Sequence, residues 1–165
     1  NIANELRGSV DGWDFKQYVL GMLFYRYISE NLTAYINKRM LDAGFEGFDY
    51  LSMSDEEAEA AREEMVSTKG FFILPSELFA NVCRRAALDD NLNETLEQAF
   101  KHIEASAVGA ESEDDFKGLF DDIDVNSKKL GDTVAKRNNK LCGIFTGIGT
   151  VKVGLIVHFQ QKAFN

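Results

Sequence analysis

The sequence has little of what stiffens or staples a chain, with one proline, two cysteines and two histidines in 165 residues. A single proline excludes a collagen-like chain and a proline-rich linker, and two cysteines are too few for a disulfide scaffold. Cys83 and Cys142 lie far apart without metal-ligand spacing, so we expect two reduced thiols. No apolar run approaches the ~18 to 20 residues of a membrane-spanning helix, and Asn1 opens no signal peptide. We expect a soluble cytoplasmic domain without a membrane partner.

The residues that are present have the composition of a globular protein. Hydrophobic residues make up 45% and charged residues 27%, which excludes a disordered chain. Thirteen Phe and five Tyr supply large apolar side chains for a core. A chain of 165 residues fits one domain of ordinary size.

Charge is distributed unevenly along the chain. The formal net charge of -9 argues against unaided binding of nucleic acid, because affinity for DNA depends on Lys and Arg that neutralise phosphates. Residues 54–66 and 104–124 contribute -5 and -7, whereas residues 125–165 carry seven basic residues and one acid. This asymmetry is typical either of an oriented docking surface or of two solvated helix faces followed by an ordinary basic helix.

Apolar residues recur at steps of three and four, which predicts a mainly helical fold. The longest predicted helix covers residues 13–41, with Asp11 as its N-cap, Gly44 as its stop and Gly21 at a close helix crossing. Asn93 is the expected cap of a later helix, and residues 143–154, with four glycines, carry no helix signal. We expect a single helical bundle with one or two short marginal strands. Residues 70–75 are predicted to form a brief strand or an extended segment, and residues 151–159 a strand or, without a partner, a disordered segment. The other predicted helices cover residues 54–66, 75–88, 93–103, 116–123 and 126–144, and residues 44–50 form an aromatic loop broken by glycines.

Two segments imitate ligand-binding loops. Residues 145–149 (FTGIG) resemble a glycine-rich cofactor turn, but no acidic residue follows and a βαβ unit cannot fit, so we expect a flexible connector. Asp122, Asp124 and Asn126 imitate the start of a calcium loop. Ser127 stands where that loop needs glycine and Thr133 where it needs a bidentate glutamate, so we expect no calcium.

No catalytic constellation is visible in the sequence. His102 and His158 have no second ligand or nucleophile that the sequence places in reach, and we interpret both as surface or core-edge histidines. The paired acids at 114–115 and 121–122 are interpreted as a solvated charge run rather than an acid–base pair. We expect no catalytic, cofactor-binding or metal-ligating residue.

A tight turn at residues 7–9 (RGS) joins two predicted helices, and Lys16 and Arg26 follow in the second. A helix N-terminus offers unpaired N–H groups that favour an anion, so a phosphate or a partner's carboxylate could dock beside Arg7. The alternative is that Arg7 holds its own turn by bonding Asp11 or Asp14.

Several segments, taken in order, carry a family resemblance. They are residues 6–11 (LRGSVD), 18–24 (YVLGMLF), 27–29 (YIS), 72–75 (FILP), 92–103 and 116–120 (FKGLF). Together they resemble the N-terminal domain of the modification subunit of type I restriction-modification systems. The resemblance covers residues 2–154 and predicts a helical domain over residues 1–154. Residues 155–165 look unlike the family, and we interpret them as an atypical tail or a truncated linker to a missing catalytic domain.

The resemblance implies a helical domain placed before a Rossmann-like methyltransferase domain. The complete subunit of this family transfers a methyl group from S-adenosylmethionine to the exocyclic amino group of adenine. It works with a specificity subunit, a second modification subunit and a restriction subunit. Adenine has to leave the base stack for this chemistry, which implies a clamp around double-stranded DNA. The family's Asn-Pro-Pro motif is missing, since the only proline is Pro75, so we expect this chain alone to be inactive and to bind no cofactor.

The resemblance makes this domain a DNA clamp and subunit-assembly module, with residues 128–140 as its phosphate contact. A rival hypothesis is a stand-alone helical adaptor whose acidic face recruits a basic partner. A small hydrolase is disfavoured, because no base is paired with a nucleophile. The candidate contacts are Arg7, Lys16, Arg26, Lys128, Lys129, Lys136, Arg137 and Lys140.

Overall fold

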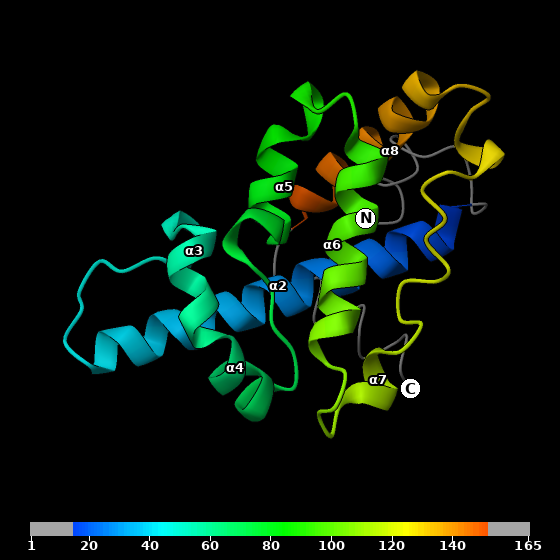
Figure 1. The fold of residues 1–165 in the computed structure, drawn as a ribbon. Coiled ribbons are helices and arrows are strands. Elements are labelled where there is room, and N and C mark those ends of the chain that lie inside the picture. The colour runs from blue at the N-terminus through cyan, green and yellow to red at the C-terminus, as the bar shows by residue number, and fades with distance from the viewer. Residues whose placement is uncertain (1–14, 152–165) are drawn as a thin grey trace.

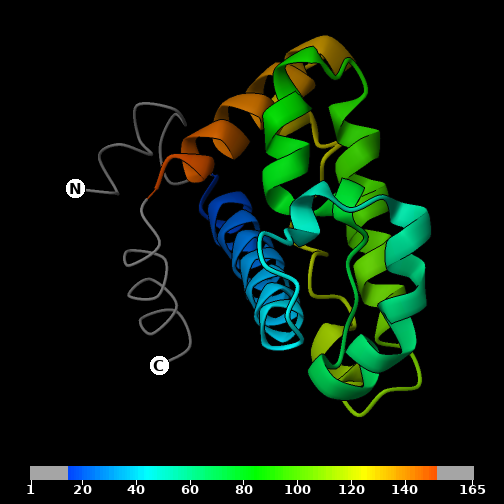
Figure 2. The same ribbon diagram turned by 90° about the vertical axis from the view of Figure 1, so that its left-hand side faces the viewer.

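The computed structural model describes residues 15–151, which form a helical bundle, as the sequence predicts, and no strand is present in that range. The longest helix, α2, crosses behind α5 and α6 (Figure 1), and α8 packs against its flank (Figure 2). No helix between residues 15 and 151 is both long and apolar enough to span a bilayer. The α-helices are α2 (Lys16–Asp42), α3 (Asp55–Ala58), α4 (Arg62–Lys69), α5 (Phe79–Arg85), α6 (Leu92–Ser106), α7 (Glu113–Phe116) and α8 (Val134–Gly149). The 3-10 turns are η2 (Tyr50–Ser52), η3 (Glu59–Ala61), η4 (Pro75–Glu77), η5 (Ala86–Leu88) and η6 (Lys128–Leu130).

The C-terminal end of α2 is where the glycine predicts it. Gly44 has a φ of +94°, which a residue without a β-carbon adopts easily. Its N–H donates to the Leu41 carbonyl at 2.9 Å, and the Phe45 N–H donates to the Met40 carbonyl at 2.9 Å. These two bonds form a Schellman motif, which satisfies carbonyls that the helix itself leaves unpaired. The predicted N-cap, Asp11, lies outside the described residues.

The core is built around Tyr25 of α2, whose side chain is completely buried. Its ring centroid lies 5.4 Å from that of Phe79 in α5, 5.3 Å from that of Phe100 in α6 and 6.0 Å from that of Phe145 in α8. The hydroxyl donates to the backbone carbonyl of Glu77, and burial raises the pKa of Tyr25, so it stays a neutral donor. One residue of α2 thus contacts three other helices, α5, α6 and α8.

The predicted single helix over residues 54–66 is divided in the structure. The sequence Ser54-Asp55-Glu56-Glu57 has the pattern of a capping box, and Ser54 is the N-cap, with its Oγ accepting the Glu57 N–H at 3.2 Å. A 3-10 turn, η3, then interrupts the helix between α3 and α4, and α4 continues to Lys69. Most side chains of this segment are exposed, with Ala58 and Met65 facing the core.

Of the two states that the sequence allows for residues 70–75, a strand and an extended segment, the strand does not form. Phe71, Phe72 and Ile73 are buried in an extended coil that has no neighbouring strand among the described residues. The Phe72 N–H donates to the Ser106 Oγ at 2.9 Å, so a side chain of α6 satisfies the backbone. The second predicted strand, at residues 151–159, lies outside the described residues apart from Val151.

Asn93 does not cap α6, because the helix begins one residue earlier, at Leu92. Its side chain is buried and donates from Nδ2 to the Asn126 Oδ1 at 2.9 Å. Its backbone N–H donates to the Asn138 Oδ1 at 3.0 Å. The asparagines therefore form a polar link between α6, α8 and the segment before η6.

The last two predicted helices differ from the structure in position. Of the predicted helix over residues 116–123, only Phe116 is helical, as the last residue of α7, and turns follow it; α8 begins at Val134 rather than at residue 126. α8 then continues to Gly149, so the predicted connector at residues 145–149 is wrong and this segment is helical. Close packing explains the glycine at position 149, since a β-carbon there would lie 2.9 Å from the Cys83 Sγ in α5.

Gly21 marks a close approach, as predicted, but its neighbour is a turn rather than a helix. A β-carbon at Gly21 would overlap the buried side chain of Ile123. We therefore expect Gly21→Ala to lower the free energy of unfolding by about 1 kcal/mol, because overpacking costs roughly 1–3 kcal/mol and the helix gains about 1 kcal/mol. Urea denaturation followed by circular dichroism measures this change. In an Ile123→Ala background the same substitution should stabilise, and an equal loss in both backgrounds would contradict the steric explanation.

Candidate nucleic-acid interface

Five basic side chains gather on η6 and the first two turns of α8, and we call this region the basic end. Lys128, Lys129 and Lys136 are exposed, and α8 has no acidic residue in its first turn. The basic end consists of Lys128, Lys129, Lys136, Arg137 and Lys140.

Local capping and one buried anchor hold the basic end in place. The Ser127 Oγ accepts the Lys129 N–H at 3.2 Å at the start of η6, and the Thr133 Oγ1 accepts the Lys136 N–H at 3.2 Å at the start of α8. Leu130 is buried beneath η6. The backbone that carries the lysines is therefore fixed even though the lysine side chains are exposed.

The other two members of the basic end are partly buried. The Arg137 Nη1 donates to the Gly131 carbonyl at 3.2 Å, which ties the first turn of α8 to the loop before it. Its Nε is buried without a hydrogen-bond partner among the described residues. The Lys140 Nζ lies 5.6 Å from the centre of the Phe15 ring, within range of a cation–π interaction.

The structure brings Lys16 to the basic end. Lys16 is exposed on the first turn of α2, next to Phe15, which Lys140 contacts. The Tyr18 hydroxyl donates to the Asp124 carbonyl at 2.7 Å and holds the same turn against the segment that leads to η6. Asp132 pairs with Lys136 at 3.0 Å and is an acid within the basic end. Arg7 lies outside the described residues.

Arg26 is buried, and its hydrogen bonds lie inside the bundle rather than on the surface. Its Nε donates to the Glu30 Oε1 at 2.7 Å. Its Nη1 donates to the carbonyls of Ile148, at 2.7 Å, and Val151, at 2.6 Å. These carbonyls lie at the C-terminal end of α8, where a positive charge is favourable. Arg26 therefore stabilises α8, and we do not retain it among the DNA contacts.

A second group of charged residues, exposed acids on three short helices, lies away from the basic end. α4 and α7 are neighbours, since the Phe71 and Phe116 rings are 5.2 Å apart and the Ser112 hydroxyl donates to the Gly70 carbonyl. We call the exposed acids of α3, α4 and α7 the acidic end, and Figure 1 shows these helices well separated from η6 and the start of α8. The acidic end consists of Glu56, Glu57, Glu63, Glu64, Glu113, Asp114 and Asp115.

A histidine–carboxylate pair lines a polar cleft of about 660 Å³ between η4 and α6. The His102 Nδ1 lies 2.7 Å from the Glu77 Oε2. Burial raises the pKa of Glu77, and the neighbouring His102 opposes this change only in part. The Ser76 hydroxyl donates to the Asp55 Oδ2 at 2.6 Å, so within the described chain no hydroxyl is bonded to His102. This cleft offers no activated nucleophile.

The other imitations of ligand sites have structural roles. The Asp124 Oδ1 accepts the Asn126 N–H at 3.0 Å, and the Asn126 Oδ1 accepts from Asn93, so the calcium-loop imitation is an ordinary turn. Between residues 15 and 151 no group of three or more potential metal ligands is close enough to hold an ion. Cys83 and Cys142 are both free thiols. No sequence pattern indicates the hydrogen bond from the Asn93 N–H to the Asn138 Oδ1, because the two residues lie 45 positions apart.

Known proteins show the same domain. The model of the HsdM N-terminal domain family matches residues 1–148. The type I restriction enzyme MpnII methylase subunit of Mycoplasma pneumoniae is 42% identical over 159 residues, which cover 92% of this chain and 29% of that subunit. The crystal structure of the type I restriction-modification system methyltransferase subunit from Streptococcus thermophilus matches with a TM-score of 0.68 and 28% identity, over 93% of this chain and 33% of that one. The chain thus spans about a third of the length of these relatives.

The buried position of Arg26 predicts a stability effect. We expect Arg26→Gln to lower the free energy of unfolding by about 2–3 kcal/mol, because two buried carbonyls lose a charged donor. Lys16→Gln, at an exposed position of the same helix, should change it by less than about 0.5 kcal/mol. Urea denaturation of the two variants makes the comparison, and equal effects would contradict a structural role for Arg26.

The raised pKa of Glu77 predicts a pH-dependent effect. A carboxyl whose pKa is raised by folding adds stability below its unfolded pKa and loses that contribution as pH rises through its folded pKa. We therefore expect Glu77→Gln to have a higher Tm than the wild type near pH 7, with a difference that shrinks towards pH 4. Thermal scans across this range measure it, and the exposed control Glu113→Gln should show no such trend. A gain that grows as pH falls would contradict the sign of the shift.

Proposed function

This chain belongs to the HsdM N-terminal domain family, and we propose that it is the DNA-clamp and subunit-assembly domain of a type I adenine-specific DNA methyltransferase. The observation that carries the clamp role is the basic end, where lysines of η6 and α8 project from a fixed backbone. The family match supports the proposal that this domain is part of a methylase subunit. The charge distribution supports the proposal that the basic end is the side that contacts DNA.

The basic end suits the phosphate backbone rather than base edges. Lys128, Lys129 and Lys136 are exposed point charges, which neutralise phosphates without reading sequence. The acidic end lies elsewhere on the molecule and is repelled by DNA, so the two ends together orient the domain on a duplex. Because the whole chain has a net charge of -9, other parts of the enzyme have to supply most of the DNA affinity.

The complete protein in this proposal is a cytoplasmic methyltransferase that modifies the exocyclic amino group of adenine. S-adenosylmethionine supplies the methyl group and is held by parts of the subunit outside this chain, since residues 145–149 are helical rather than a cofactor turn. The proposed partners are double-stranded DNA, a specificity subunit, a second modification subunit and a restriction subunit. Adenine has to be flipped out of the duplex, and a clamp keeps the duplex in place while it is extruded.

The acidic end supports a second candidate function, a helical adaptor that docks a basic partner. Exposed acids from α4 and α7 lie on neighbouring elements and form one negative surface. The family match favours the clamp, because the relatives are methylase subunits about three times as long as this chain. DNA binding that depends on the basic end distinguishes the two functions.

The clamp role predicts a position-specific loss of DNA affinity. We expect the triple variant Lys128→Gln/Lys129→Gln/Lys136→Gln, in the assembled methylase, to bind duplex DNA more weakly. The slope of log K against log salt concentration should become less negative by about 0.9 for each lost phosphate contact, or roughly 3 in total. Fluorescence anisotropy between about 50 and 200 mM salt measures both quantities.

A matched control carries the same change of net charge at exposed lysines elsewhere. Lys38→Gln/Lys101→Gln/Lys117→Gln removes three charges from α2, α6 and the turn after α7. It should leave the slope nearly unchanged. Equal losses of DNA affinity in both triple variants would mean that the effect comes from net charge alone. No loss of affinity in the first variant would refute the proposed DNA contact.

A further inference from the structure

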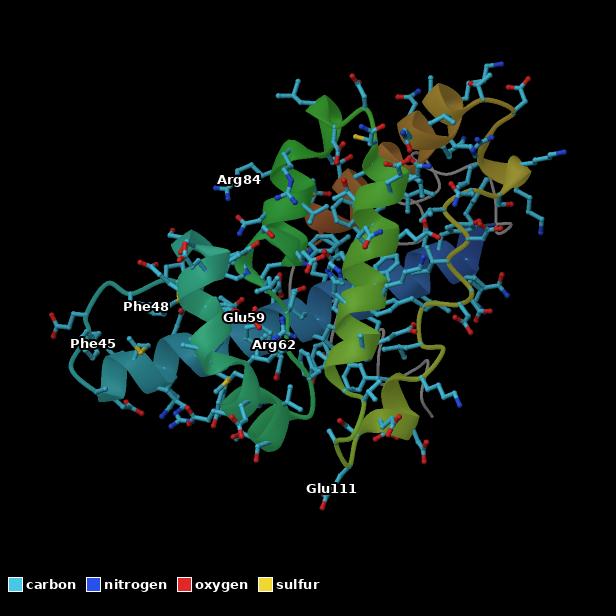
Figure 3. The ribbon with its side chains drawn as sticks, viewed as in Figure 1. Phe45, Phe48, Glu59, Arg62, Arg84 and Glu111 are labelled. Atoms are coloured by element: carbon cyan, nitrogen blue, oxygen red, sulfur yellow. The ribbon has the colours of Figure 1, made fainter. Side chains whose placement is uncertain are left out.

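The loop between α2 and η2 presents apolar side chains to solvent at one extremity of the molecule. Leu41 is 55% exposed and Phe45 is 58% exposed, whereas Phe48 is partly buried against the core. We call these three residues the aromatic tip. Figure 3 shows Phe45 beyond the end of α2, with Phe48 on the same loop.

The aromatic tip is held rigidly. The Schellman bonds of Gly44 and Phe45 close its first half. In its second half, the Asn37 Oδ1 accepts the Tyr50 N–H at 2.8 Å and the Asp49 Oδ1 accepts the Leu51 N–H at 3.1 Å. The loop is thus anchored on both sides, so the exposed rings lose little conformational entropy when a partner covers them.

The charges around the aromatic tip select the kind of partner. Residues 40–49 contain three acids, Asp42, Glu46 and Asp49, and no basic residue, and all three acids are exposed. Lys38 pairs with Asp42 at 3.0 Å, and the other two acids remain to set the charge of the rim. DNA and a second copy of the same tip are both repelled. The complementary surface is an apolar pocket bordered by Lys or Arg.

The size of the aromatic tip indicates a tethered partner. A stable association of separate proteins buries about 800 Å² on each side, and a few side chains at a loop end provide much less. A covalent tether raises the effective concentration and makes such a small contact sufficient. About two thirds of the length of each relative lies outside the part that this chain covers. Val151 is bonded to Arg26, which lies 15 residues before Leu41, or about 22 Å along α2, so a following domain is within reach of the tip.

We propose that the aromatic tip inserts into a basic-rimmed apolar pocket on the remaining part of the same methylase polypeptide. The contact fixes the angle between the clamp domain and the part that follows it. This inference rests on the proposed function, because it requires the chain to be one domain of a longer subunit.

Hydroxyl-radical footprinting of Phe45 tests the proposal in two samples, the 165-residue chain and the full-length subunit. We expect Phe45 to be modified several-fold less in the full-length subunit. Leu88, which is 89% exposed at the end of α5, is the internal reference for radical dose. Equal modification of Phe45 in both samples would overturn the proposal. Protection that requires added subunits would assign the tip to another chain and would also overturn it.

A variant provides an independent measurement. Leu41→Ser/Phe45→Ser in the full-length subunit should raise the rate of limited proteolysis after residue 151 several-fold, whereas the control Leu88→Ser/Val108→Ser should not. Circular dichroism verifies that both variants keep the wild-type helix content. The salt dependence of DNA binding is recorded in parallel: a subunit that binds DNA through the basic end but leaves Phe45 unprotected refutes the tip contact alone, whereas a protected tip without DNA binding refutes the clamp alone.

Discussion

A tyrosine hydroxyl buried in an apolar core has to find an acceptor, and in this bundle Tyr25 finds the backbone carbonyl of Glu77. That bond fixes η4 against the middle of α2, and α5 starts directly after η4. The Tyr25 ring contacts Phe79, Phe100 and Phe145. This one side chain therefore sets how closely α5, α6 and α8 pack against α2. The positions of the basic end and the aromatic tip depend on this centre, because both lie at the ends of helices that it holds.

Local patterns were enough to predict the parts of the fold that local interactions determine. The end of α2 at Gly44 and the cap at Ser54 depend on residues within a few positions, and both are where the sequence indicates. The sequence does not decide between a strand and a coil at residues 70–75, because an apolar run has the same composition in either state. Its conformation depends on the Ser106 hydroxyl, 34 positions from Phe72. The glycine at position 149 of α8 depends likewise on a distant residue, since it packs against Cys83.

The candidate site divides along the same line. The charge distribution along the sequence is enough to predict the basic end, because residues 125–165 carry seven basic residues and one acid. Arg26 was a candidate because it follows the turn at residues 7–9 on the next predicted helix, but its acceptors at Ile148 and Val151 lie 122 and 125 positions away. A surface arginine and one that caps a distant helix look identical in sequence. The sequence also predicts the glycine-broken loop at residues 44–50. It does not predict that Phe45 is exposed to solvent on this loop.

The link between Arg26 and the end of α8 has a mechanical consequence. A helix that is pulled at its C-terminus normally unravels from its last turn, where the carbonyls have no partners within the helix. Here the Arg26 guanidinium holds the carbonyls of Ile148 and Val151, and Glu30 holds the guanidinium. A force applied at Val151 is therefore transmitted through Arg26 to the 27-residue helix α2. The last turn of α8 then resists unwinding, and the domain moves as one rigid unit.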